Sequence, residues 1–324
     1  MEFLSKYSTA LETQLAQTVH VKEPIHLYEP INYIVSLGGK RLRPILTLMT
    51  CDFFNADFNK AMNAALAVEL FHNFSLIHDD IMDKAPLRRG KETVHEKWDI
   101  NAGILSGDAM LILAYQLFEC YEPKLFRALA ELFSKTALEV CEGQQYDVDF
   151  ESREDVSIAE YIHMINCKTA VLLGAAMKMG AIVAESSEKC CTQIYEFGRN
   201  LGIAFQLQDD YLDAFGDSDS FGKQIGGDII SNKKTLLYIT ALTLSNSAEA
   251  ETLRNLYSIS PKDTSEKIET VKRIFDSSGA AAAIQNEIEN YTKKAYTCLE
   301  HVQISSEKKD ILRSFGNWLM QRTV

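Results

Sequence analysis

Two short clusters of aspartates are the groups in the sequence most suited to chemistry, because carboxylates can bind metal ions or transfer protons. Residues 79–83 and 209–213 both read DDxxD, and they lie about 130 residues apart. On a helix, residues four apart share one face, so the first and last aspartates of each cluster would form a local pair of carboxylates. Each cluster follows a strongly apolar stretch, residues 74–78 or 203–208. This indicates that each cluster lies at the C-terminal end of a buried helix.

Paired carboxylates at the C-terminal end of a helix repel one another and face the negative end of the helix dipole. Such pairs are unfavourable unless a cation neutralises them. Carboxylate oxygens suit Mg²⁺, which keeps several waters and is shared with substrate phosphates. The alternative is a solvated acidic helix end. Two copies, each preceded by an apolar run, favour a metal site over that alternative.

Positive charge is concentrated in two packets near the first acidic cluster. Residues 38–44 read GGKRLRP, and residues 88–90 read RRG. In an otherwise acidic chain, these packets are natural clamps for a diphosphate, arginine through its planar fork and lysine as a point charge. Either packet alone would be ordinary surface charge. Their position beside an aspartate cluster favours the diphosphate interpretation.

The elements that must position these residues are predicted to be helices. Only six prolines occur, five of them by position 123, and apolar residues recur at steps of three and four. We expect an all-α fold, a helical bundle that forms one domain over residues 1–324, because no linker-like stretch divides the chain. The expected helices cover residues 59–83, 101–121, 124–148, 157–184, 188–214 and 280–300, with a break at 277–279.

Bulk properties exclude several classes of function. The chain has 33 basic and 45 acidic residues and a net charge of -12, which is the wrong sign for nucleic-acid binding. No uncharged apolar run is long enough to span a membrane, so we expect no membrane-spanning segment. Seven cysteines form no CxxC pair, and the first 20 residues lack an apolar signal core. A cytoplasmic location is the expectation.

Seven motifs stand in an order that resembles the trans-isoprenyl diphosphate synthases, the polyprenyl synthetase family, over roughly residues 35–240. They are GGKRLRP, LIHDDIMD, RRG, GDAMLILAYQ, KTA, FQLQDDYLD and GKQIGGDIISNKKT. The resemblance implies an isoprenoid-synthase bundle around a deep central cavity, with the two DDxxD clusters facing each other across its mouth. It also implies a homodimer and about three Mg²⁺ ions.

The resemblance assigns roles to residues at matching positions. It implies that the direct Mg²⁺ ligands are Asp79, Asp83 and Asp209, with Asp80 and Asp213 supporting them. The groups that hold the allylic diphosphate would be Arg88, Lys168, Lys223 and Lys233. The isopentenyl diphosphate site would comprise Lys40, Arg43, His72 and Arg89. His72, without the family, would be taken for an ordinary histidine on a helix.

The implied reaction is a prenyl transfer. Mg²⁺ and the basic residues stabilise pyrophosphate as it leaves the allylic substrate, and the double bond of isopentenyl diphosphate attacks the resulting carbocation. Loss of a proton then gives the longer allylic product. The catalytic set would be Lys168, Thr169, Gln206, Lys223 and Lys233, with the Thr169 and Gln206 side chains near the developing cation.

Two alternatives share parts of this pattern. A class I terpene cyclase uses a DDxxD in the same bundle, but its second metal motif typically contains Asn and Ser, whereas the second cluster here is DDYLD. A non-catalytic subunit of a heteromeric prenyl synthase keeps the fold and loses metal ligands, whereas all six cluster aspartates are present. Both observations favour the synthase.

The product length is predicted from the residues just before the first cluster. Phe74 lies five positions before Asp79, about 7.5 Å along a helix, and Phe71 lies one turn further. The resemblance, not the helical spacing, aims Phe74 into the cavity as the floor under the growing chain. Ser75 is not aromatic, and the first cluster lacks the two-residue insertion that is usual in bacterial farnesyl diphosphate synthases. This combination more closely resembles geranylgeranyl diphosphate synthases, so the resemblance favours a geranylgeranyl (C20) product over farnesyl (C15).

Overall fold

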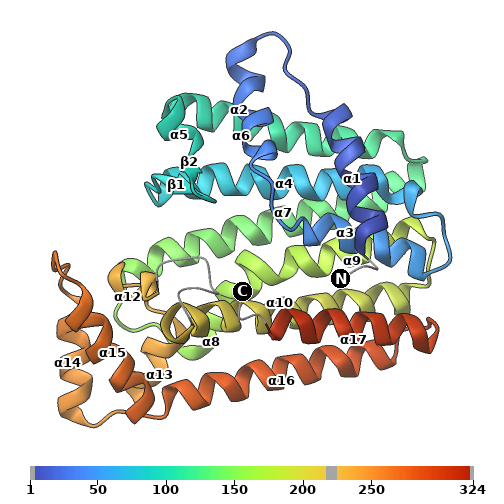
Figure 1. The fold of residues 1–324 in the computed structure, drawn as a ribbon. Coiled ribbons are helices and arrows are strands. Elements are labelled where there is room, and N and C mark those ends of the chain that lie inside the picture. Colours follow the sequence, from blue (N-terminus) through green and yellow to red (C-terminus); the bar gives the residue numbers. More distant parts are fainter. Residues whose placement is uncertain (1–3, 217–224, 322–324) are drawn as a thin grey trace. The chain divides into compact units, whose positions relative to one another are not determined.

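The computed structural model describes residues 4–216 and 225–321, and these are almost entirely helical (Figure 1). Within these two ranges the strands are limited to β1 (Leu87–Arg88) and β2 (Lys91–Glu92), which pair antiparallel as a two-residue hairpin. The all-α prediction is confirmed.

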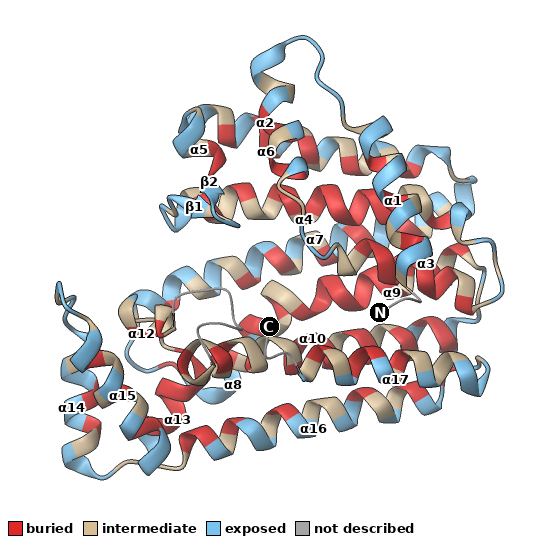
Figure 2. Cartoon of the chain, in the orientation of Figure 1, coloured by how far each residue is buried: buried red, intermediate tan, exposed pale blue. Residues whose placement is uncertain are grey.

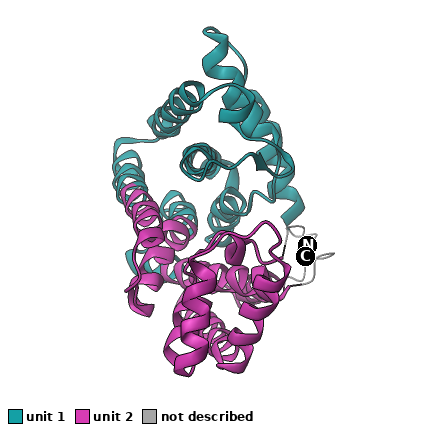
Figure 3. Ribbon diagram, turned by 90° about the vertical axis from the view of Figure 1, so that its left-hand side faces the viewer, with its two compact units in different colours: residues 1–137, 175–195 teal, residues 138–174, 196–324 magenta. Residues whose placement is uncertain are grey.

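The chain divides into two compact units, which Figure 3 colours separately. Unit 1 comprises residues 1–137 and 175–195, and unit 2 comprises residues 138–174 and 196–324. The division falls inside three long helices, which are α7 (Pro123–Ser152), α9 (Val171–Val183) and α10 (Glu188–Phe215). One domain over residues 1–324 stays a prediction.

Unit 1 carries the N-terminal helices, the hairpin and the first aspartate cluster. Its α-helices are α1 (Ser5–Thr18), α2 (Ile25–Ser36), α3 (Leu42–Phe53), α4 (Met62–Met82), α5 (Val94–Lys97) and α6 (Ile100–Gln116). Two short 3₁₀ turns, η2 (Phe58–Ala61) and η3 (Leu117–Cys120), extend α4 and α6.

Unit 2 carries the second aspartate cluster and the C-terminal helices. Its shorter elements are α8 (Ile158–Ile165), the π-helix η4 (Asn166–Ala170), α12 (Gly227–Ile230) and α13 (Leu236–Leu244). They are followed by α14 (Ser247–Tyr257), α15 (Ser265–Ser277), α16 (Ala280–Glu300) and α17 (Ser306–Met320). The last two run side by side in Figure 1.

Several helices are buried along most of their length. In α4 the side chains from Ala64 to Phe71 are buried, and Figure 2 shows α4, α9 and α13 largely in the buried colour. The helix ends follow familiar chemistry. A capping box joins Ser157 and Glu160 at the start of α8, and Gly279, with a φ of 84°, separates α15 from α16 at the predicted break.

One apolar face remains exposed in unit 1. Ile104, Leu105 and Ile112 on α6 are 42%, 60% and 58% exposed. By length and composition alone, the helical stretch Ile100–Cys120 could cross a membrane, and only 28% of its most apolar window is buried. A single helix of this kind is weak evidence for membrane insertion, but its uncovered surface needs an explanation.

Candidate active site

The first aspartate cluster lies at the C-terminal end of α4. The Asp83 N–H donates a 2.9 Å hydrogen bond to the Asp79 carbonyl oxygen, so helical geometry continues through the cluster and these two residues share a face. Asp80 is only 1% exposed. Both of its carboxylate oxygens accept hydrogen bonds from Arg88 Nε, at 2.9 and 2.8 Å.

The Asp80–Arg88 pair fixes a cation beside the cluster. Burial raises the pKa of the Asp80 carboxyl, and the hydrogen bonds from Arg88 act in the opposite direction. Arg88 Nη2 also lies 3.6 Å from Asp79 Oδ2. Asp80 thus anchors the arginine that the sequence assigned to a diphosphate.

The two predicted basic packets meet at the tip of the hairpin. Arg89 and Gly90 both have positive φ, 54° and 73°, as a two-residue hairpin turn requires. Arg89 Nη1 donates a hydrogen bond to the Gly38 carbonyl oxygen. A Cβ added at Gly39 would lie 2.7 Å from Arg89 Nη2, so this glycine is needed for the guanidinium to approach the backbone.

A buried ion pair that the sequence did not predict supports the same region. Arg41 Nη1 lies 2.8 Å from Glu69 Oε1, with side chains only 10% and 3% exposed. Arg41 Nη2 donates to the Val35 carbonyl oxygen at 2.8 Å, and Asn73 donates to Glu69 Oε1 at 2.9 Å. Arg41 and Glu69 are 28 positions apart, so no local spacing in the sequence connects them.

His72 lies about two helical turns before the aspartate cluster and within reach of Arg43. Arg43 Nη1 is 3.3 Å from His72 Nε2. Burial holds the pKa of His72 well below its usual value, and the charges of Arg43, Arg89 and Arg88 lower it further. A neutral imidazole can accept the Arg43 hydrogen bond. Lys40, predicted for the same site, is exposed.

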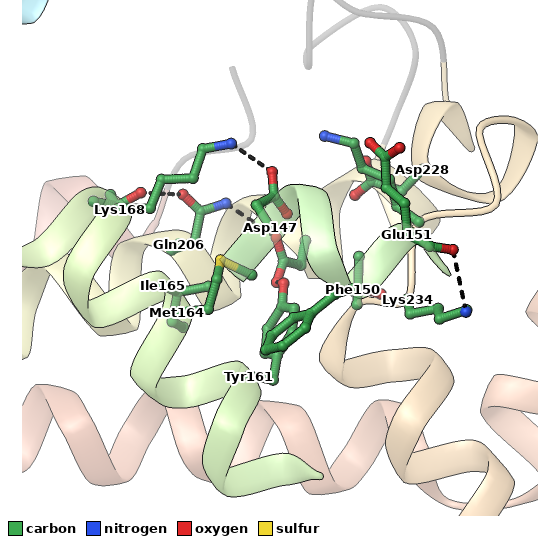
Figure 4. Close-up of a pocket in the computed structure, with 14 residues that line it drawn as sticks. Asp147, Phe150, Glu151, Tyr161, Met164, Ile165, Lys168, Gln206, Asp228 and Lys234 are labelled. Atoms are coloured by element: carbon green, nitrogen blue, oxygen red, sulfur yellow. Dashed lines mark hydrogen bonds and ion pairs between the residues drawn. The ribbon is translucent and has the colours of Figure 1, made fainter. Parts of the chain in front are cut away.

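Unit 2 contains a cavity of about 110 Å³, drawn in Figure 4. Four predicted catalytic residues line it: Lys168, Thr169, Gln206 and Lys233. Carboxylates also line it, from Asp147, Glu151, Asp210 and Asp228. Lys223, the fifth predicted catalytic residue, lies outside the residues that the structure describes.

The π-helix η4 presents Lys168 and Thr169. Such single-turn π segments interrupt α-helices and are frequent at functional sites. A close approach of α7 accompanies this one, because a Cβ at Gly143 would lie 2.2 Å from the Lys168 nitrogen and 2.7 Å from the Cys167 carbonyl carbon. Any side chain at Gly143 would force the helices apart.

Lys168 is held by a carboxylate that the sequence did not single out. Lys168 Nζ lies 2.5 Å from Asp147 Oδ2 on α7, and Figure 4 shows the pair at the edge of the cavity. The two residues are 21 positions apart on different helices, so no local spacing connects them.

A chain of hydrogen bonds crosses the floor of the cavity. Thr169 Oγ1 donates to Gln206 Oε1 at 3.0 Å, and Gln206 Nε2 donates to Asp210 Oδ1 at 3.1 Å. The Tyr161 hydroxyl donates to Asp210 Oδ2 at 2.5 Å. Burial, followed by the charge of Asp228, raises the pKa of Asp210 to about 8. This chain fixes which end of the Gln206 amide faces Thr169.

The second aspartate cluster is joined to the segment that carries Lys233. Asp213 Oδ2 accepts a 2.9 Å hydrogen bond from the Asp228 N–H, and the Asp213 carbonyl accepts one from the Gly226 N–H at 2.6 Å. The Lys233 N–H then donates to the Asp228 carbonyl at 2.8 Å. Asp209 is partly exposed at the start of this cluster.

Each unit therefore gathers carboxylates and cations of the kind that bind a diphosphate and a divalent cation. The residues matched to isopentenyl diphosphate lie in unit 1, and those matched to ionisation of the allylic substrate lie mainly in unit 2. With intact aspartate clusters on an all-α fold, these groups define a prenyltransferase of the isoprenoid synthase class.

Comparison with known proteins identifies the family. Residues 24–275 match the polyprenyl synthetase family, and the chain belongs to it. A crystal structure of a geranylgeranyl pyrophosphate synthase shares 53% identity, with a TM-score of 0.95 and 98% of each chain covered. The geranylgeranyl diphosphate synthase of Methanosarcina mazei is 39% identical over 236 residues, 72% of this chain and 73% of its own length.

A relative named for a longer product is also similar. The geranylfarnesyl diphosphate synthase of Natronomonas pharaonis is 32% identical over 328 residues, which covers 95% of this chain and 94% of that protein. Family membership therefore fixes the reaction class, a transfer between prenyl diphosphates, more firmly than it fixes the product length.

Proposed function

We propose that this protein is a Mg²⁺-dependent geranylgeranyl diphosphate synthase. It adds isopentenyl diphosphate to allylic diphosphates, releases pyrophosphate at each addition, and stops at C20. The observation that carries the proposal is the hydrogen-bonded chain Thr169–Gln206–Asp210 beside Lys168 in one cavity, since it combines a diphosphate-binding cation with oriented neutral dipoles.

The aspartate clusters fit a divalent metal. Asp79 and Asp83 share one face of α4 and offer only hard oxygen donors, which suit Mg²⁺. Each cluster can give a metal only part of its octahedral shell, so substrate phosphate and water would complete it. A bound Mg²⁺ supplies charge neutralisation at the diphosphate oxygens. We assign the direct ligands to Asp79, Asp83 and Asp209, with Asp80 and Asp213 supporting them.

The cationic side chains bind and orient the two diphosphates. Arg88, fixed by Asp80, and Lys168, fixed by Asp147, would hold the allylic diphosphate together with Lys233 and Lys223. Arg43, Arg89 and Lys40 would hold isopentenyl diphosphate, with neutral His72 orienting Arg43. Because donors of this kind are already in position, the free-energy cost of reorganising them is small when charge develops on the leaving pyrophosphate.

The bond changes in the reaction balance without a covalent enzyme intermediate. The allylic C–O bond breaks and its electron pair leaves with pyrophosphate. The double bond of isopentenyl diphosphate forms the new C–C bond, and the adjacent carbon loses a proton, which the departing pyrophosphate would accept, to restore an alkene. Because Gln206 donates to Asp210, its carbonyl oxygen faces Thr169, and the oxygen atoms of both side chains can stabilise the cation.

Support for the C20 product comes from an aromatic cluster in unit 1. The ring of Phe133 on α7 lies 5.2 Å from Phe71, 4.8 Å from Tyr115 and 5.2 Å from Phe118. Phe74 packs on Phe71 at 5.5 Å and keeps 9% of its surface accessible. We assign Phe74 as the floor that the product meets and Phe71 as its support.

We assign the exposed apolar face of α6 to a second copy of the chain rather than to lipid. A homodimer through this face would bury Leu105 and Ile112. In a monomer these apolar side chains would remain exposed to water, which is unfavourable. Replacing both with lysine should give monomers in light scattering coupled to gel filtration. Leu244→Lys, at an equally exposed leucine in unit 2, is the matched control and should leave the dimer intact.

The test of the proposed reaction uses three primers. Purified protein with Mg²⁺ and isopentenyl diphosphate is given dimethylallyl, geranyl or farnesyl diphosphate, and products are sized by mass spectrometry. A C20 diphosphate supports the proposal, whereas a C15 or C25 end product would reassign the length. Hydrocarbon formed from an allylic diphosphate alone would indicate a terpene cyclase, and complete inactivity a non-catalytic subunit.

A further inference from the structure

A lysine in unit 2 is buried without playing any part in the proposed chemistry. Lys267 on α15 is only 2% exposed. Its Nζ donates to the side-chain oxygen of Asn232 at 2.5 Å and to the Ile259 carbonyl oxygen at 3.0 Å, both neutral acceptors. Burying an ammonium group is costly, and burial indeed lowers the pKa of Lys267. The hydrogen bonds of Lys267 to Asn232 and Ile259 must therefore offset this cost.

The residue that Lys267 holds is the one directly before Lys233. Asn232 has a φ of 58°, in the left-handed region that asparagine tolerates better than most residues. Its side chain also donates to the Ile259 carbonyl at 3.3 Å. Lys267, Asn232 and Ile259 therefore form a closed three-member network that fixes the turn at the end of α12.

The neighbouring residue on α15 supports the other end of the same segment. Ile268 packs against Gly226, because a Cβ at Gly226 would lie 3.1 Å from three Ile268 side-chain atoms. Gly226 begins α12 with a φ of 79°. Two consecutive residues of α15 thus contact the two ends of the segment 226–232, and Asp213 holds its start from the second aspartate cluster.

Such external support is needed because α12 has only four residues. A helix of this length cannot sustain itself, since nucleation costs more than one turn of hydrogen bonds returns. The backbone position of Lys233, which lines the cavity, therefore depends on what holds the segment from behind.

We propose that Lys267 is a positioning residue for the allylic diphosphate: through Asn232 it fixes the turn that carries Lys233 at the cavity. The inference rests on the proposed function. Lys267 does not touch substrate, and its effect is transmitted by the backbone of residues 232–233. Lys267→Met keeps the length and most of the volume of the side chain and removes both hydrogen bonds.

The kinetic test compares the two substrates separately. In Lys267→Met, the KM for the allylic diphosphate should rise about tenfold and kcat should fall about tenfold, because a misplaced binding group costs on this order. The KM for isopentenyl diphosphate should stay within about twofold of the wild type, since its predicted ligands are in unit 1. Lys262→Met, at an exposed lysine before α15, is the control and should behave as the wild type.

A second variant separates positioning from general destabilisation. Asn232→Gly keeps the positive φ, removes the acceptor of Lys267, and lies at a partly exposed position that tolerates the change. It should reproduce the rise in allylic KM. The double variant Lys267→Met/Asn232→Gly should be no worse than Lys267→Met alone, because the proposed effect is transmitted through the Lys267–Asn232 hydrogen bond, which either change removes.

The outcomes distinguish this inference from the proposed function. Inactive wild type and Lys262→Met would overturn the proposed function and, with it, the inference. Active wild type with an unchanged allylic KM in Asn232→Gly, or equal rises in both KM values, would overturn the positioning role alone. Multiplicative losses in the double variant would also overturn it, because the two residues would then act independently.

Discussion

The Tyr161 hydroxyl donates a 2.5 Å hydrogen bond to Asp210, the second aspartate of the second cluster. Burial, followed by the charge of Asp210, raises the pKa of Tyr161 well above its usual value, so the hydroxyl keeps its proton and acts as the donor. Asp210 in turn accepts from Gln206. A tyrosine on α8 therefore determines the orientation of a glutamine on α10.

Tyr161→Phe should reduce turnover while leaving the fold intact. It removes one of two donors to Asp210, whose pKa of about 8 keeps the carboxyl largely protonated at neutral pH. A hydrogen bond between neutral groups contributes about 0.5–1.5 kcal/mol, so we expect kcat to fall about two- to tenfold. Steady-state kinetics would measure it, with Tyr291→Phe on α16 as control. An unchanged kcat would show that Gln206 is held without Tyr161.

Asp79→Ala and Asp209→Ala should each lower kcat by about a thousandfold or more, because each removes a proposed ligand of a diphosphate-bridging metal. The activity of both variants should also require higher Mg²⁺ concentrations, which a metal titration would reveal. Asp276→Ala, at an exposed aspartate on α15, is the control. Near-normal activity in either cluster variant would refute the assignment of the metal ligands.

The features that could be predicted from the sequence were those that depend on the spacing of residues close together in the chain. The helical periodicity of residues 59–83 and 188–214 predicted α4 and α10 to within about three residues. The predicted break at Ser277-Ser278-Gly279 is also present in the structure, where Gly279 has a positive φ. Glycine is the residue that adopts this backbone conformation most readily, so the sequence marks the position. The predicted apolar character of these helices is seen as burial on nearly every side of α4.

The residues that hold the site in place could not be predicted, because their partners are distant in sequence. Asp147 and Lys168 are 21 positions apart, and Lys267 and Asn232 are 35 apart. A buried lysine and a buried glutamate look like ordinary surface charges in a helical sequence. Only the packing of several helices shows that Glu69 and Lys267 are enclosed.

Glu69→Leu should destabilise the protein through the partner that it leaves behind. Removing one member of a buried ion pair strands the other charge, which costs about 3–5 kcal/mol of the free energy of unfolding. Urea denaturation would measure it. Arg41→Met/Glu69→Leu should lose less than the sum of the single variants, because it strands no charge. In the exposed Arg127–Glu131 pair, Glu131→Ala should change stability little.

Phe74→Ala should lengthen the product, because it removes the proposed floor and leaves room for another isoprene unit. Product sizing by mass spectrometry would show C25 or longer diphosphates. Phe133→Ala, behind the floor, should instead cost about 3–5 kcal/mol of stability as a buried ring is lost. An unchanged product from folded Phe74→Ala would mean that another residue stops elongation.

His72 should make the protein less stable as the pH falls. Its folded-state pKa lies well below the ordinary value of 6.5, so below that pH the unfolded chain binds a proton that the folded chain does not. Stability is therefore full above about pH 6.5 and is lost, by at most about 1.4 kcal/mol per pH unit, as the pH falls towards the folded pKa. Arg43 from α3 and Arg88 and Arg89 from the hairpin face the ring and oppose its protonation.

His72→Gln isolates this contribution, because glutamine keeps an acceptor for Arg43 and does not titrate. Between about pH 5 and 7 the free energy of unfolding should depend less on pH in His72→Gln than in the wild type. Burial raises the pKa of Glu69 and gives the opposite slope, but Glu69 is present in both proteins and cancels in the difference. His301→Gln, at an exposed histidine after α16, controls for loss of any histidine. Equal slopes in the wild type and His72→Gln would mean that His72 accepts a proton in the folded protein as readily as in the unfolded chain.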